Sequence, residues 1–181
     1  YALETTKLRA HPELAPAGTA WRYPKGTPEA SSPTDAWRAR AFDDSSWPQG
    51  SASIGYGETF IRTALNDMRG GYTSVYLRVA FDVPDPTDVR ALVLEAQYDD
   101  GFNAWINGVH VATANVPSAD MPYNGTASSA LENLTFQRVA LPDPAGYLAA
   151  GRNILAVHFL NSSLADSRDA FFDARLSVTA A

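Results

Sequence analysis

The chain has 181 residues, of which 45% are hydrophobic and 11% aromatic, a composition that suits one domain with a sizeable apolar core. Twenty acidic against 14 basic residues give a formal charge of −6, which disfavours a nucleic-acid-binding surface because such surfaces rely on clustered Lys and Arg. Cysteine is absent, which excludes disulfides and thiolate chemistry, and no apolar run reaches the roughly 18 residues that a membrane span needs.

The chain opens with a polar segment rich in Pro and Ala over residues 1–18, which predicts a linker or an edge segment. A single domain is expected over residues 19–181. The opening residues lack the charged and then apolar layout of a signal peptide, and Tyr1 in place of methionine gives the appearance of a piece excised from a longer protein.

Alternation of apolar and polar residues predicts β-strands along most of the domain. In the segment 74–83, alternate residues from Val75 to Phe81 are apolar, whereas Tyr76 and Arg78 belong to the opposite face. Similar segments occur at 91–98, 136–141, 153–160 and 174–179. About eight such strands, with no helix beyond a short turn at 144–151, predict an all-β fold, namely an antiparallel β-sandwich of the jelly-roll type.

The Asn-Gly pair at 107–108 predicts a two-residue hairpin turn, because both residues accept the positive φ that such turns require. This turn would pair Trp105 with His110 and Asn103 with Ala112. One face of the hairpin is then apolar, and the other carries Asn103, Trp105 and His110.

Trp105 could serve as a platform for a sugar ring, since an aromatic face meets the C–H side of a sugar while an amide and an imidazole bond its hydroxyls. Asn103 and His110 would supply those polar groups. In the alternative interpretation, Trp105 packs under a loop or inside a core, as most tryptophans do.

Asp99 and Asp100 form an acidic pair of the kind that performs glycoside hydrolysis. Catalytic carboxyls lie about 5–10 Å apart across a cleft, whereas adjacent residues in a tight turn point apart. We therefore expect these residues, with Gly101, to serve turn formation through side-chain-to-backbone bonds.

Four blocks, in this order, resemble the galactose-binding-like jelly-roll domains: WRARAFDDSSWPQGSASIGYG at 37–57, VYLRVAFDV at 75–83, YDDGFNAWINGVHVATANVP at 98–117 and GRNILAVHFLN at 151–161. The resemblance implies a non-catalytic carbohydrate-binding module, appended to a secreted bacterial enzyme and located outside the cell or at its surface. Its partners would be a polysaccharide or oligosaccharide and the covalently linked neighbouring domains. A structural or interaction sandwich without a sugar site is the alternative.

The ligand in such domains lies among loops at one end of the sandwich or across its concave face. The first arrangement implicates four residues in turn-rich segments, Trp37, Tyr56, Tyr123 and Arg168. The second implicates Asn103, Trp105 and His110. For each loop aromatic, simple covering of the core edge is the alternative.

The resemblance also implies a structural calcium site, formed by an Asp-rich loop and an acidic residue near the last strand. Here the matching residues are Asp43, Asp44 and Asp173. Calcium takes six to eight oxygen ligands, which carboxylates and backbone carbonyls of a tight loop can supply. Alternatively, Asp44 caps a turn and Asp173 pairs with Arg168 or Arg175.

No further catalytic constellation is evident. His11, His110 and His158 are far apart in the sequence, and neither a His-Glu-x-x-His nor a Gly-x-Ser-x-Gly motif occurs. His158 alternates with apolar residues and is expected to be a hydrogen-bonded core histidine. An enzyme in its own right is therefore the last of the three hypotheses.

Overall fold

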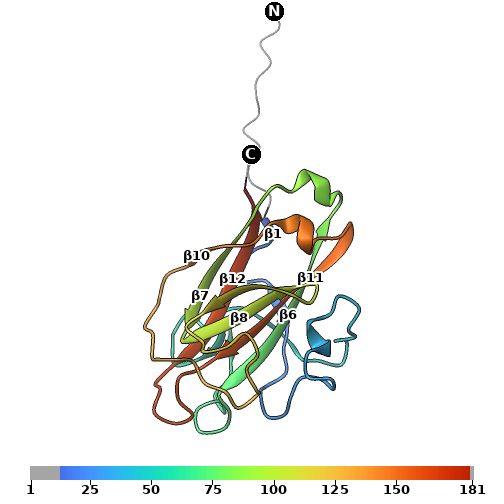
Figure 1. Cartoon of the computed structure of the whole chain (residues 1–181). Helices are drawn as coiled ribbons and strands as arrows, with labels where there is room; N and C mark the ends of the chain where they lie inside the picture. Colours follow the sequence, from blue (N-terminus) through green and yellow to red (C-terminus); the bar gives the residue numbers. More distant parts are fainter. Residues whose placement is uncertain (1–12, 180–181) are drawn as a thin grey trace, which may run out of the picture.

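The structure, a computed structural model, describes residues 13–179 and consists of two β-sheets packed face to face (Figure 1). Its elements in chain order are β1 (Glu13–Ala15), β2 (Ala20–Arg22), η1 (Ala36–Arg38), β3 (Gln49–Ser51), β4 (Ile54–Tyr56), β5 (Thr63–Ala64), β6 (Ser74–Val83), η2 (Pro86–Asp88), β7 (Leu92–Asp99), β8 (Gly101–Ile106), β9 (Val109–Ala114), β10 (Gln137–Ala140), η3 (Pro144–Gly146), β11 (Gly151–Leu160) and β12 (Ala170–Val178). Each η element is a single 3-10 turn. No helix of this described range has the length and apolar character needed to cross a lipid bilayer.

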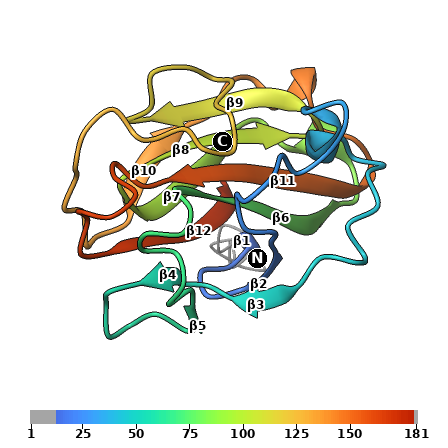
Figure 2. The same ribbon diagram turned by 90° about the horizontal axis from the view of Figure 1, so that it is seen from below.

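Sheet A has the strand order β10-β7-β12-β4-β5, with β1 also paired to β12, and sheet B has the order β3-β2-β6-β11-β8-β9. Strand pairs are antiparallel except β4 with β5. From β6 to β12 the chain alternates between the sheets at every step but the β8–β9 hairpin, as Figure 2 shows from below. The predicted antiparallel sandwich of jelly-roll type is confirmed.

The apolar core lies between the two sheets. Val75, Leu77 and Val79 of β6 face inward, in the alternation that the sequence predicts, and Phe172 of β12 meets them from the opposite sheet. Full burial of one such side chain stabilises the fold by about 1.5–3 kcal/mol. The alternating sequence therefore determines which face of each long strand enters the core.

The long strands agree with the sequence prediction, whereas the first third of the domain does not. The segment predicted at 74–83 is β6 itself, and the short turn expected at 144–151 contains η3. The short strands β1 to β5 have two or three residues each, too few for alternation to be recognised. Of the segment predicted as linker or edge, Glu13–Ala15 forms β1 on sheet A, and residues 1–12 lie outside the described range.

The β8–β9 hairpin has the predicted turn and, near it, the predicted pairing. Asn107 and the following glycine have φ values of 52° and 87°, and Trp105 pairs with His110. Beyond that pair the register shifts, so that Asn103 pairs with Thr113 and not with Ala112. The prediction was wrong at this point because a β-bulge adds one residue to β9.

The Asp100-Gly101 pair does not form the predicted tight turn. Asp99 ends β7 in sheet A and Gly101 begins β8 in sheet B, so the chain crosses here between sheets. A Cβ on Gly101 would lie 2.8 Å from the carbonyl oxygen of Ala114, which explains a glycine without positive φ. This correction changes the role of both aspartates.

Candidate functional site

The outer face of sheet B is covered by the segment 23–48, which carries η1. Figure 2 shows this blue segment lying over β11. Beneath it lies a second group of buried side chains, separate from the core between the sheets: Trp37, Tyr76, Trp105, Ile154 and Ala156. We refer to these five residues as the outer cluster.

Three aromatic rings hold the outer cluster together. Trp37 packs edge-on against Tyr76, with ring centroids 5.0 Å apart, and against Trp105 at 5.5 Å. All three side chains are at most 2% exposed. Trp37, assigned from the sequence to the end loops, and Trp105, assigned to the concave face, are thus in contact.

Arg78, which is fully buried on the same outer face, fastens the covering segment to sheet B. Its Nε donates to Asp44 Oδ2 at 2.7 Å, and its terminal nitrogens donate to the carbonyl oxygens of Trp37, Ala39 and Phe42. Burial lowers the pKa of the guanidinium, and the bond to Asp44 opposes that effect. One side chain therefore satisfies three carbonyl oxygens of irregular backbone.

A small pocket opens between the covering segment and the loop that follows β9. Its volume is about 230 Å³, and its lining consists of Glu29, Thr34, Trp37, Arg38, Tyr76, Asp120, Met121 and Pro122. Ligand pockets for drug-sized molecules have about 300–1,000 Å³. This pocket therefore suits a small ligand or the end of a chain.

Charged groups surround the aromatic floor of the pocket. The Glu29 carboxylate accepts bonds from the Tyr76 hydroxyl at 2.8 Å and from the Tyr123 backbone N–H at 3.1 Å. Arg38 pairs with Asp120 at 2.6 Å and lies over the Trp105 ring, 4.0 Å from its centroid. Burial, followed by the bond to Glu29, raises the pKa of Tyr76, so its hydroxyl stays a donor.

Several polar atoms of this region have no hydrogen-bond partner within the described residues. They are Trp37 Nε1, Arg38 Nε and both ring nitrogens of His158. His158 stacks on Tyr76 at 4.2 Å, and burial, with a smaller effect of Arg38, lowers its pKa to about 3. The expected core histidine is buried, but the prediction that it is hydrogen-bonded was wrong.

Of the two interpretations left open for Trp105, the sugar platform does not fit the structure, because Arg38 and η1 cover the ring. Asn103 is fully buried, and its amide is used internally: it donates to Ser118 O and accepts from Thr113 Oγ1. His110 is exposed at the hairpin end and shares a 2.8 Å hydrogen bond with Thr113. The structure agrees with the alternative interpretation, in which Trp105 packs under a loop.

The four predicted end-loop residues do not form one site. Trp37 is fully buried, and Tyr56 lies in β4, where its hydroxyl accepts from Asn161 and donates to Ser167 O. Tyr123 packs against the outer cluster next to the pocket, whereas Arg168 is exposed in the loop before β12. Only Trp37 and Tyr123 of this set are brought near each other around the pocket.

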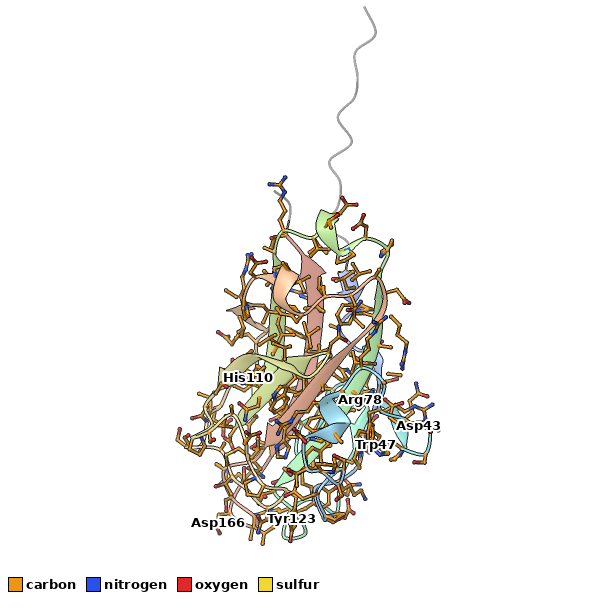
Figure 3. The ribbon with its side chains drawn as sticks, turned by 45° about the vertical axis from the view of Figure 1, so that its right-hand side comes forward. Asp43, Trp47, Arg78, His110, Tyr123 and Asp166 are labelled. Atoms are coloured by element: carbon orange, nitrogen blue, oxygen red, sulfur yellow. The ribbon has the colours of Figure 1, made fainter. Side chains whose placement is uncertain are left out.

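The predicted calcium ligands lie on opposite sides of the sandwich, so that ligand set is wrong. Asp44 pairs with Arg78 on the outer face of sheet B, and exposed Asp43 accepts from Ser45 N at 3.0 Å (Figure 3). Asp173 points away from the core on the outer face of sheet A, where it accepts from Gly18 N. The carbonyls that calcium would use at Asp44 bind the Arg78 guanidinium instead.

Sequence reasoning missed the pocket residues Glu29, Arg38 and Asp120. Each is a charged residue in a segment without periodicity, which gives no signal of its own. Tyr76 did have a signal, because the alternation in β6 placed an aromatic residue beside an arginine on the non-core face. A large aromatic residue there indicates a covering layer.

Comparison with solved structures gives similar folds in parts of larger enzymes. A β-glucuronidase from an uncultured Clostridium species matches 94% of this chain with a TM-score of 0.56 at 13% identity. A glycosyl hydrolase family 2 member from Bacteroides cellulosilyticus matches 92% with a TM-score of 0.58 at 14% identity. The β-glucuronidase of Bacteroides uniformis matches 93% with a TM-score of 0.57 at 16% identity.

At these identities the likeness shows the fold alone. The chain spans 29%, 20% and 18% of those three proteins, respectively. No protein-family model matches the sequence, and a search of curated proteins gives no match either.

Proposed function

We propose that this domain is a non-catalytic carbohydrate-binding module that contacts the end of a sugar chain at the pocket beside Trp37 and Tyr76. The carrying observation is the combination in one small pocket of an aromatic floor with Arg38, Glu29 and Asp120 at its walls. Carboxylates and a guanidinium can bond several sugar hydroxyls at once.

One further observation supports the proposal. The structures with a similar fold come from β-glucuronidases and a glycosyl hydrolase, of which such a fold is a minor part. In that arrangement the module would serve a catalytic domain in a longer, secreted chain.

The test is affinity gel electrophoresis on a panel of soluble polysaccharides, including xylan, galactan, β-glucan and pectin, followed by calorimetry with oligosaccharides of the retained one. Arg38→Ala removes the wall that covers Trp105 and should weaken binding about tenfold or more, which corresponds to about 1.4 kcal/mol. Arg90→Ala, in the exposed connection between β6 and β7, is the matched control and should bind as the unmodified domain does.

Arg168→Ala separates the pocket from the end-loop arrangement. Loss of binding in this variant with full binding in Arg38→Ala would contradict the pocket assignment. Absence of retention on every polysaccharide would contradict sugar binding itself.

A structural or interaction domain is the second candidate. The observation in its favour is that Trp37, Tyr76 and Trp105 are at most 2% exposed, so none of these three rings offers an open platform to a sugar. Retention on no polysaccharide, together with stable association of the domain with the rest of its parent chain, would favour this function.

A further inference from the structure

Three carboxylates from distant parts of the sequence meet at one end of the sandwich. Asp99 ends β7, Glu132 lies in the loop before β10, and Asp169 immediately precedes β12. One oxygen of each lies within 4.8 Å of the others. Asp99 and Asp169 are buried, and Glu132 is exposed, so the group opens to solvent on one side.

The fold holds the backbone of these residues in place. Asp100 accepts from Leu131 N at 2.7 Å, next to Glu132, and from Ser162 N at 2.5 Å. Asp99 and Asp100, both expected to serve a local turn, therefore differ in role. Asp100 accepts backbone hydrogen bonds from two loops that are distant in the sequence, whereas Asp99 lies close to the other two acids.

Gly57 allows the third segment to approach. A Cβ on this residue would lie 2.5 Å from Asp169 Cβ, and its φ of 97° also favours glycine. The close contact between the residue that follows β4 and the segment before β12 therefore depends on this glycine.

Asp99 itself points to a missing ligand. The residue is 2% exposed, and its Oδ1 has no hydrogen-bond partner in residues 13–179. No Lys or Arg of that range forms an ion pair with any of the three acids. A buried carboxylate without a donor or counter-charge is unfavourable, and a bound cation would compensate it.

We propose that Asp99, Glu132 and Asp169 bind a calcium ion that joins β7, the loop before β10 and the start of β12. The ligands are carboxylate oxygens without His or Cys, which selects hard cations such as calcium or magnesium. Calcium accepts irregular geometry and completes its shell with carbonyl oxygens and water, whereas magnesium requires a near-ideal octahedron. Three irregularly connected segments therefore favour calcium. The site is separate from the sugar pocket.

The experiment is calorimetric titration of the metal-free domain with CaCl2 and MgCl2, combined with thermal unfolding in calcium and in EDTA. We expect saturable binding of one calcium ion and weaker binding of magnesium. A calcium concentration a hundredfold above the dissociation constant should raise the melting temperature by about 5–10 °C.

Variants identify the ligands. Glu132→Gln changes an exposed side chain and keeps the fold, and it should weaken calcium binding at least tenfold; Asp99→Asn should abolish the melting shift. Asp166→Asn, in the exposed part of the loop before β12, is the matched control and should respond to calcium as the unmodified domain does.

Two results would overturn the proposal. One is identical melting in calcium and EDTA without binding heat. The other is equal loss of binding in Asp166→Asn and Glu132→Gln, which would indicate an acidic surface that attracts cations diffusely. Sugar retention is measured separately, so failure of either proposal is distinguishable from failure of the other.

Discussion

The inner and outer faces of sheet B are stabilised in different ways. The inner face packs apolar side chains against sheet A, and the alternation of the strands is enough to create it. The outer face combines aromatic rings with a buried arginine, a glutamate and a histidine, and its cover is a segment with almost no regular structure. An irregular segment can therefore cover the face of a sheet when a buried side chain of that sheet, here Arg78, donates hydrogen bonds to its carbonyl oxygens.

The largest effect is expected for Phe172→Ala in the inner core. Phe172 packs against Trp21 and Phe102, with ring centroids 5.9 and 5.4 Å away, and is 1% exposed. Its removal leaves a cavity and should lower the free energy of unfolding by about 3–5 kcal/mol, measured by urea denaturation. Leu164→Ala, 46% exposed, is the control and should change stability by less than about 0.5 kcal/mol. A small effect of Phe172→Ala would mean that the sheets do not form one packed core.

Arg78→Met tests the outer face. It should lower the free energy of unfolding by about 2–4 kcal/mol, because the Asp44 carboxylate and three carbonyl oxygens lose their donor. Arg78→Lys keeps the charge but not the planar fork, and should recover only part of the loss. Full stability of Arg78→Met in urea denaturation would show that the covering segment is held by its aromatic residues alone.

The smallest expected change in the free energy of unfolding concerns His158, and it depends on pH. Its pKa is lowered to about 3 in the folded state from 6.5, so the unfolded chain binds the extra proton and stability falls as pH drops below about 6.5. Between pH 7 and pH 5 the unmodified domain should lose about 2 kcal/mol more than His158→Phe, from urea denaturation at each pH. Equal losses in the two proteins would show that the imidazole is not kept neutral.

Sequence reasoning succeeded where one physical signal repeats. β6 and β11 each have ten residues. Over that length the alternation of apolar and polar residues shows that the segment is a strand, and also which of its side chains enter the core. It failed at Asn103, because a bulge in β9 changes the register without any compositional mark. The short strands β1 to β5 are stabilised by their neighbours and not by their own pattern.

The site was less predictable than the fold for a related reason. Trp37 and Trp105 were both identified as candidates, but only the path of the covering segment brings them together. The oxygens bound by Arg78 are mainly backbone carbonyls, which every residue has and no sequence motif distinguishes. Asp99, Glu132 and Asp169 are far apart along the chain. They come together only through the three-dimensional fold, in which the chain crosses between the sheets after β7.

The distribution of the four tryptophans gives this domain built-in optical reporters. Trp21 lies in the inner core, Trp37 and Trp105 lie in the outer cluster, and Trp47 is half-buried at its rim. Emission from a variant that retains only Trp21 follows the joining of the sheets, whereas emission from one that retains only Trp37 follows the docking of the cover. Fluorescence during refolding can therefore show whether the covering segment docks together with the sheets or after them.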